Sequence, residues 1–266
     1  MGETSTEIRI QSWAHLCDAV YTGAWKPGLR RYRTDMAFRG LSSAVYELRT
    51  GFRRTCGDHT ELEHHILRAF RRYARTAEPS QTQTIWRSLI LAQHHGLPTR
   101  LLDWTYSPFV AMHFATAGTT RYDQDGVIWM VDFVETNRRS PEPLQRFIRE
   151  ERCSAFTVEM LEQAAPTLRD FDAVPGGPHA IFFEPPSLDD RIVNQYALFS
   201  VMSDPQADMD RWLTRHPGLS TRLIIPRELK WEIRDKLDQA NITERVLFPG
   251  LDGLAEWLKR QYTPVV

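Results

Sequence analysis

The sequence predicts a single domain of the α+β class, with a helix-rich N-terminal half packed on a mixed or antiparallel sheet. Helical spacing of apolar residues dominates up to about residue 125, and continuous apolar runs dominate after it. The regular alternation of strands and helices that would indicate a doubly wound fold is absent. We divide the 266 residues into a helical lead-in at 5–34, a core at 35–134, an irregular insertion at 135–178 and a strand-rich part at 179–266.

The N-terminal half contains four predicted helices and one predicted strand. Apolar residues at mostly helical spacing up to Val20 predict the first helix. Another helix begins at Pro108, because Ser107 is a good N-cap and proline suits the first helical position. The strand is a short apolar run that ends at Gly40. The expected elements are helices at 5–20, 62–73, 84–94 and from 108 onward, with the strand at 35–40.

The C-terminal half contains most of the predicted strands. Continuous apolar runs such as GVIWMVDF indicate buried strands bounded by turn residues. The segment 136–178 is rich in charge, proline and glycine, so we expect one helix plus loops there. The remaining elements are strands at 126–133, 180–184, 196–201, 222–225 and 245–248, and helices at 229–239 and 251–260.

Composition excludes several broad classes of protein. Lys and Arg total 33 against 34 for Asp and Glu, so no global attraction to nucleic acid or to an acidic membrane is implied. The three cysteines lie far apart in the sequence, which argues against a disulfide framework or a thiolate zinc site. Neither an apolar signal segment nor an apolar run of about 18 residues occurs. We therefore expect a cytoplasmic protein.

The densest polar motif is QHHGLPTRLLDWT, from Gln93 to Thr105, followed directly by SPFVAMHFAT. Polar side chains in a buried setting require hydrogen-bond partners, so such a concentration favours a functional site. The alternative is a polar turn that joins two helices, in which Arg100 and Asp103 form a structural ion pair.

Other sequence signals are weaker. The arginines of the helix at 62–73 and its end form a basic face that is either solvated surface or a patch for a phosphate-bearing partner: Arg68, Arg71, Arg72 and Arg75. The pairs His64-His65 and His94-His95 are adjacent, so one helix face does not present both imidazoles to a metal ion. Dinucleotide-binding, phosphate-loop, zinc-protease and nucleophile-elbow motifs are absent from the sequence. We expect no metal.

The motif QHHGLPTRLLDWT and the triplet Phe38-Arg39-Gly40 resemble the FRG domain family, which is named after that triplet. The resemblance continues through RIVNQYALFSV and through the C-terminal segments IIPRELKWEI and VLFPGLDGLAEWL. It therefore extends roughly from Trp13 to Leu258. The long motif is a specific match, whereas the triplet alone is a weak one.

More distantly, the order of motifs resembles the ADP-ribosyltransferase superfamily, which implies a split sheet. In that superfamily an arginine ends the first strand, a serine-threonine element precedes a helix, and Asn-Glu-Tyr or a single glutamate lies on a later strand. Here Arg39 takes the arginine position, Thr105–Ser107 falls near the serine-threonine element, and Asn194-Gln195-Tyr196 falls on the later strand. A guanidinium binds phosphate or ribose oxygens through two parallel hydrogen bonds.

The sequence departs from this pattern at Gln195, where the transferases carry a carboxylate. An amide makes the same hydrogen bond but supplies no charge, and electrostatic stabilisation is usually the largest catalytic effect. Either Asp103 or Glu184 compensates, or turnover is slow, or the domain binds its ligand without transfer. For Arg39 and Gln195 themselves the alternatives are a buried ion pair and a strand amide, and for Trp104 simple core packing.

The resemblance implies NAD+-dependent ADP-ribosyl transfer or NAD+ cleavage, with NAD+ as the substrate, by an intracellular toxin or phage-defence effector. The acceptor is open between protein, nucleic acid and water. The alternative is a non-catalytic nucleotide- or nucleic-acid-binding module. We predict one cleft with catalytic residues Arg39, His95, Asp103 and Gln195, and with binding residues Arg39, Gln93, Arg100, Trp104, Thr105, Ser107, Asn194 and Tyr196.

Overall fold

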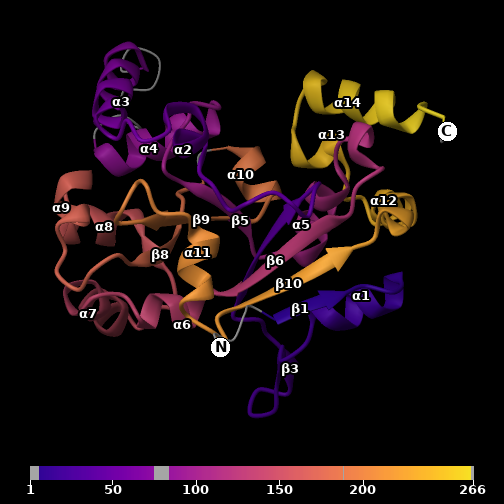
Figure 1. Cartoon of the computed structure of the whole chain (residues 1–266), viewed down its shortest axis with the longest axis horizontal. Coiled ribbons are helices and arrows are strands. Elements are labelled where there is room, and N and C mark those ends of the chain that lie inside the picture. The colour runs from indigo at the N-terminus through magenta and orange to yellow at the C-terminus, as the bar shows by residue number, and fades with distance from the viewer. Residues whose placement is uncertain (1–5, 75–83, 188, 265–266) are drawn as a thin grey trace.

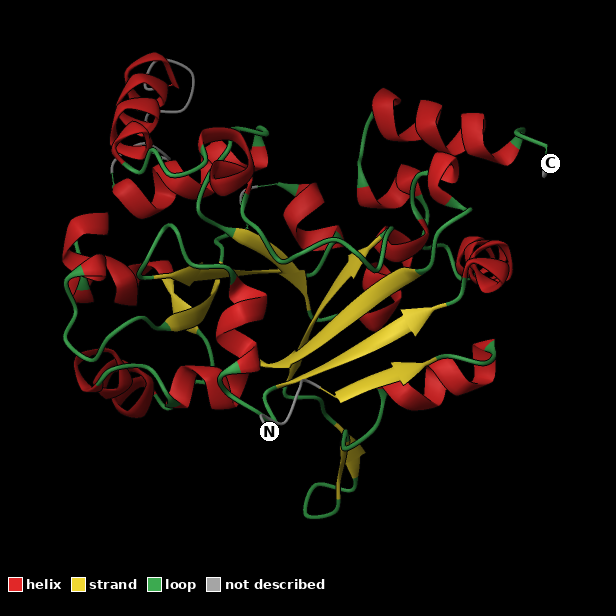
Figure 2. Cartoon of the chain, in the orientation of Figure 1, coloured by secondary structure: helices red, strands yellow, loops and turns green. Residues whose placement is uncertain are grey.

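A computed structural model describes residues 6–74, 84–187 and 189–264 of the chain. Ten strands occur in these ranges: β1 (Thr6–Arg9), β2 (Trp25–Lys26), β3 (Arg31–Tyr32), β4 (Met36–Leu41), β5 (Leu102–Thr105), β6 (Gly126–Asp132), β7 (Phe156–Thr157), β8 (Ala180–Glu184), β9 (Ala197–Met202) and β10 (Ser220–Ile225). Eight of them form one mixed sheet in the order β1-β10-β6-β4-β5-β9-β8-β7 (Figure 2). The pairs β1/β10 and β7/β8 are parallel, and the other neighbours in this sheet are antiparallel.

Helices lie on both faces and at both ends of this sheet (Figure 1). The described residues contain α1 (Trp13–Val20), α2 (Gly51–Cys56), α3 (Glu61–Ala74), α4 (Ile85–His94), α5 (Pro108–Thr116), α6 (Phe133–Arg138), α7 (Glu142–Glu151), α8 (Val158–Ala164), α9 (Leu168–Asp172), α10 (Asp190–Asn194), α11 (Met209–Thr214), α12 (Lys230–Gln239), α13 (Glu244–Leu247) and α14 (Leu251–Gln261). Two 3-10 turns, at Thr119–Arg121 and Arg227–Leu229, complete the set. Among these helices none is long and apolar enough to cross a membrane.

The hydrophobic core is divided differently on the two faces of the sheet. On one face a single cluster runs across both halves of the sheet and is covered by α6 and α11. On the other face α1, α5 and α12 cover the β1-β10-β6-β4 half, whereas α4, α7, α8 and α9 cover the β5-β9-β8-β7 half. The boundary between these two helical layers lies over the junction of β4 and β5.

The junction of β4 and β5 is the weakest point of the sheet. These strands share the single registered pair Phe38–Thr105, whereas β4 and β6 are paired over six residues. The predicted split sheet therefore takes the form of one continuous sheet whose two halves separate beyond this pair. Strands that separate leave backbone groups without a ladder partner, and those groups need other partners.

Most of the predicted elements are confirmed, and their caps explain why. Ser107 accepts a hydrogen bond from the backbone N–H of Val110, with Pro108 in the first helical turn, so α5 begins where the sequence indicates. The apolar run that begins at Gly126 forms the central strand β6. The predicted strands at 35–40, 180–184, 196–201 and 222–225 correspond to β4, β8, β9 and β10, and the helices at 62–73, 84–94, 229–239 and 251–260 to α3, α4, α12 and α14.

Four expectations about elements are wrong. The single helix at 5–20 is strand β1 followed by α1, because Ser12 caps a new helix. The strand at 245–248 is the short helix α13, capped by Thr243. The segment 135–178 is mostly helical, with capping side chains at Thr157 and Thr167. The part 179–266 is not strand-rich, since five helices accompany its three strands in the described residues.

Candidate functional site

Arg39 lies where β4 and β5 separate. Because β4 does not pair with Asp103, the carbonyl of Asp103 is free to accept a hydrogen bond from Nη1 of Arg39. The same Nη1 lies 3.7 Å from Oδ2 of Asp103. Among the described residues, Nε of Arg39 is buried without a hydrogen-bond partner, and no residue accepts a hydrogen bond from its Nη2. Burial lowers the pKa of Arg39, while the charge of Asp103 acts in the opposite direction.

Gly40 is required by the packing around this arginine. Helix α5 approaches β4 so closely that a Cβ at position 40 would overlap the carbonyl oxygen of Ala111. A glycine in a strand often marks such a close approach of a second backbone. The Phe-Arg-Gly triplet therefore combines a core side chain, an arginine at the strand separation and a contact point for α5.

The motif QHHGLPTRLLDWT forms the end of α4, a turn and β5. Gly96 adopts a φ of +78°, which suits glycine at the end of a helix. The Thr99 hydroxyl donates to Oε1 of Gln93, and Nε2 of Gln93 donates to Oδ2 of Asp103 over 2.9 Å. This chain of hydrogen bonds fixes the Asp103 carboxylate, whose side chain is still 57 % exposed. The carboxylate is thus both oriented and accessible.

A cavity of about 180 Å³ lies over the strand junction, between α4, α5 and α10. Alternation along the strands turns Phe38, Thr105 and Phe199 toward it, and Phe114 of α5 supplies another apolar wall. A second cavity, of about 320 Å³, adjoins the same guanidinium and includes Arg54. The residues predicted for the site that line the first cavity are Arg39, Gln93, Asp103, Trp104, Thr105 and Gln195.

Gln195 reaches this cavity from a position that the sequence did not predict. It is the C-cap of α10 rather than a strand residue. Its side-chain Nε2 donates to the backbone carbonyl of Leu247 over 3.0 Å. The backbone carbonyl of Gln195 accepts a hydrogen bond from the Thr105 hydroxyl. The amide therefore ties α10 to the end of α13. Its side chain is only partly committed, because no residue in the described ranges donates to its Oε1.

The two neighbours of Gln195 do not line the cavity. Asn194 donates through Nδ2 to the carbonyl of Val246, also at the end of α13. Tyr196 is 62 % exposed, adopts a φ of +51° and packs its ring edge against Tyr106. The prediction that Asn194-Gln195-Tyr196 lies on a strand is wrong, because the Asp189 cap starts α10 in this segment.

Ser107 and Trp104 have identifiable structural partners. The Ser107 hydroxyl is the N-cap of α5 and the residue lies outside the cavity lining. Trp104 lines the cavity, yet its Nε1 donates to the Ser200 hydroxyl over 2.8 Å and its ring packs against Phe182. Both residues hold the walls of the site in place.

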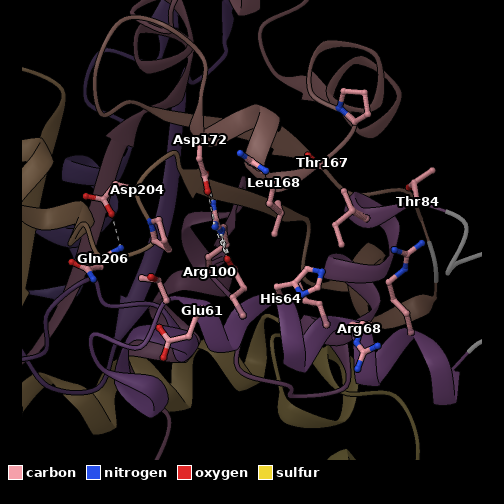
Figure 3. A pocket seen from close by; sticks show the side chains of 18 of the residues that line it. Glu61, His64, Arg68, Thr84, Arg100, Thr167, Leu168, Asp172, Asp204 and Gln206 are labelled. Carbon is pink, nitrogen blue, oxygen red and sulfur yellow. Dashed lines mark hydrogen bonds and ion pairs between the residues drawn. The ribbon is translucent and has the colours of Figure 1, made fainter.

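Arg100 belongs to a different cavity. Its guanidinium donates to both oxygens of Glu63 and to both oxygens of Asp172, and the residue is 4 % exposed (Figure 3). Although burial alone would lower its pKa, these two carboxylates raise the pKa of Arg100 above its usual value. The expected convergence of Arg100 with Arg39 is wrong, and so is the Arg100–Asp103 ion pair, because two other carboxylates take up the guanidinium.

The histidine at the cavity is His94, not the predicted His95. His95 is the exposed C-cap of α4 and does not line the cavity. His94 lines it and places Nε2 2.6 Å from Oδ2 of Asp189. Burial lowers the pKa of His94, opposed by the charge of Asp189. The two histidines are adjacent on the chain, and sequence alone did not distinguish their directions.

Sequence reasoning also missed Arg191. Its guanidinium donates to the carbonyl of His94 over 3.3 Å and lies over the ring of Phe248, 5.0 Å from the ring centroid. It lines the same cavity as Arg39, so the site contains two arginines and one carboxylate. The available signal was the capping residue Asp189, which predicts a helix start and brings Arg191 onto its first turn.

The donor set around the cavity suits organic and anionic ligands. In the described part of the chain, no group of three or more His, Cys, Asp and Glu side chains is arranged to hold a metal ion. Two guanidiniums are good partners for phosphate or carboxylate oxygens, and the amide groups and Asp103 suit hydroxyl groups. Apolar walls from Phe114 and Phe199 provide surfaces for a ring.

The comparison with protein families identifies part of the N-terminal half of the sequence. Residues 34–124 match the FRG domain family. This part of the chain is an FRG domain. Its bounds contain Arg39 and the whole of QHHGLPTRLLDWT. We call the cavity of about 180 Å³ over the strand junction the FRG domain cavity; Arg191 and Gln195 line it from the C-terminal part of the chain. The comparisons with curated proteins and with solved structures found no match. The likeness to ADP-ribosyltransferases stays a prediction.

Proposed function

We propose that the FRG domain cavity binds NAD+ and that the chain transfers its ADP-ribosyl group or hydrolyses it. The observation that carries this proposal is the pairing of Arg39 with Asp103 at the strand junction, with an Nη2 group open to a ligand. A cationic fork beside an accessible carboxylate suits a substrate that carries phosphates next to a ribose. Arg191 adds a second cation at the same cavity.

The size of the cavity favours the nicotinamide ribose end of NAD+. Pockets that enclose a whole drug-sized ligand measure roughly 300–1,000 Å³. The cavity of about 180 Å³ suits one ring or one sugar, not a dinucleotide. The adjoining cavity beside Arg54 is available to the phosphates. Arg39 borders both cavities, so we assign it to the link between ribose and pyrophosphate.

The reaction that we propose breaks the glycosidic bond between ribose C1′ and the nicotinamide nitrogen. The bond's electron pair leaves with nicotinamide, and an acceptor oxygen or nitrogen forms the new bond to C1′ and loses a proton. Developing positive charge on the ribose requires a nearby carboxylate. Asp103 lines the cavity, whereas Glu184 accepts a hydrogen bond from Tyr106 and does not line it. We therefore assign the charge-stabilising role to Asp103.

A non-catalytic binding module is the second candidate, and one observation favours it. The side-chain N–H of Gln195 is committed to the Leu247 carbonyl, and the residue has no charge to offer a transition state. A nucleic-acid version of this candidate would use the basic face of α3. Arg72 of that face stacks over Tyr73, and Arg75 lies outside the described residues. Filter binding of short RNA and DNA at two salt concentrations tests it, because phosphate contacts weaken steeply with salt.

The test of the proposed function is incubation of the chain with labelled NAD+, with and without cell lysate. We expect nicotinamide release, and label on an acceptor if the reaction is a transfer. In Asp103→Asn the rate should fall about 10²–10³-fold, the usual loss when one charge-stabilising group is removed. Glu184→Gln is the matched control and should leave the rate unchanged. Absence of both release and NAD+ binding in the wild type would remove the proposal.

A further inference from the structure

A large cavity in the described part of the chain lies away from the Arg39 site. It measures about 940 Å³ and is bounded by α3, α9 and the 204–206 loop (Figure 3). Its lining shares no residue with the FRG domain cavity. A volume near the upper end of the range for small-molecule sites accommodates a ligand the size of a nucleotide. Arg100 of the motif QHHGLPTRLLDWT lies in its lining, but the proposed reaction does not use this cavity.

The carboxylates that line the large cavity all have partners. Glu63 and Asp172 share Arg100 in its buried floor. The others are Glu162, which pairs with Thr84 and Arg87, Glu61, which pairs with His59, and Asp204, whose Oδ1 accepts from the backbone of Gln206. Their charges are thus compensated in part before any ligand arrives.

Two arginines at the large cavity have no such compensation. Arg68 on α3 and Arg169 on α9 line it, and neither guanidinium forms a hydrogen bond or ion pair with another described residue. They belong to two different helices that border the same cavity, and both residues are exposed to solvent. Unpaired cations on both walls of a concave site favour an anionic group, and guanidinium is well matched to phosphate.

The rest of the large cavity has a different chemistry. Figure 3 shows Arg68 and Thr84 toward one end and Glu61 and Asp204 toward the other, with His64 between them. Leu67, Ile85 and Leu168 add apolar surface. A ligand that fits this gradient carries an anion at one end, a flat or apolar group in the middle, and hydrogen-bond donors at the other end. Carboxylates hold ribose hydroxyl groups in many nucleotide sites.

We infer that the large cavity is a binding site for a nucleoside monophosphate. Arg68 and Arg169 hold the phosphate, the apolar residues and His64 contact the base, and Asp204 accepts hydrogen bonds from the ribose hydroxyl groups or an exocyclic amine. Asp204 retains Oδ2 for this role, because only Oδ1 is engaged by Gln206. The inference is independent of the proposed function, since it uses no residue of the Arg39 site.

The test is calorimetric titration of the full chain with AMP, adenosine and inorganic phosphate. We expect AMP to bind, and adenosine and phosphate each to bind at least about tenfold more weakly, because each lacks one half of the ligand. In the double variant Arg68→Glu/Arg169→Glu, AMP affinity should fall by at least about tenfold for each arginine replaced. Arg72→Glu is the matched control, since Arg72 lies on the same helix and does not line the cavity.

Several outcomes would overturn the inference. AMP binding that persists in the double variant would remove the phosphate role of these arginines. Equal affinity for phosphate and AMP would reduce the site to an anion subsite. Loss of AMP binding in Arg39→Lys would locate the nucleotide in the FRG domain cavity, and absence of AMP binding in the wild type would leave no nucleotide site. If the double glutamate variant melts early, Arg68→Gln/Arg169→Gln replaces it in the same titration.

Discussion

Arg39 and Arg100 lie in the two motifs that identify the FRG domain, and their surroundings are opposite. Arg100 is enclosed by two carboxylates that together accept at three of its nitrogens. Arg39 has one carbonyl, a carboxylate at 3.7 Å and a buried Nε without a partner among the described residues. The carboxylates raise the pKa of Arg100, whereas burial lowers that of Arg39.

The difference shows what makes an arginine available to a ligand. A guanidinium whose three nitrogens all donate to buried or half-buried carboxylates contributes chiefly to the fold. One that is held by a single carbonyl keeps its orientation and retains an open donor. Unsatisfied buried polar atoms in native proteins call for an explanation, and a functional site is one. We therefore assign Arg100 to the scaffold and Arg39 to the site.

The largest expected effect is on stability, from removal of Arg100. Arg100→Met leaves Glu63 buried without its cation and should lower the free energy of unfolding by about 3–5 kcal/mol. Arg39→Met removes one hydrogen bond and should cost about 1 kcal/mol. Urea unfolding of both variants measures the difference at constant m value. Equal losses in the free energy of unfolding for the two variants would contradict the structural role that we assign to Arg100 alone.

A third buried arginine extends the comparison to pH. Arg234 donates to Nδ1 of His113 over 2.7 Å, so this histidine is held neutral. Burial, assisted by the charge of Arg234, lowers the pKa of His113 to about 3. Between pH 6.5 and 3 the unfolded chain binds a proton that the folded chain does not, so stability falls as pH falls.

The size of this pH effect follows from the same shift. From pH 6.5 to 5 the loss attributable to His113 should be roughly 2 kcal/mol. In His113→Gln the dependence of unfolding midpoint on pH should become flatter over this window, while His94 and His179, whose pKa values burial also lowers, keep part of it. Identical slopes for variant and wild type would show that the pKa of His113 is the same in the folded and the unfolded chain, which would contradict the effect of burial.

The smallest expected effect concerns Gln195. Gln195→Glu removes the hydrogen bond to the Leu247 carbonyl and should cost about 1 kcal/mol of stability. On the proposed function it should retain or raise nicotinamide release, because it adds a carboxylate to the FRG domain cavity. A lower melting temperature together with unchanged NAD+ binding and nicotinamide release would give Gln195 a structural role, as we assign to Arg100.

Much of the fold was predictable because its signals are local. Continuous apolar runs predicted β6 and β8, and Ser107-Pro108 predicted the start of α5. The failures lie in short elements. A run of four apolar or mixed residues does not distinguish a strand from one helical turn, so α13 was predicted as a strand. In the segment 135–178, polar N-cap residues such as Thr157 start helices that the sequence analysis had predicted as loops.

The site was predictable only in part, for a different reason. Arg39, Asp103, Thr105 and Gln195 were expected together and line one cavity. The sequence also predicted Arg100 for this cavity, and that prediction is wrong. A polar motif does not reveal which carboxylates from distant segments face each guanidinium. Its partner Glu63 lies 37 residues away in sequence. Arg191 was missed for the same reason, since only the fold brings α10 against α4.

The central claim is that Arg39 holds NAD+ through its open guanidinium. Calorimetric titration of NAD+ into wild type and Arg39→Lys tests it directly, because lysine keeps the charge and loses the planar fork. We predict an affinity loss equivalent to about 1.5–3 kcal/mol in the variant, with a melting temperature close to that of the wild type. Equal NAD+ affinity in the two proteins, or no NAD+ binding by the wild type, would contradict the account.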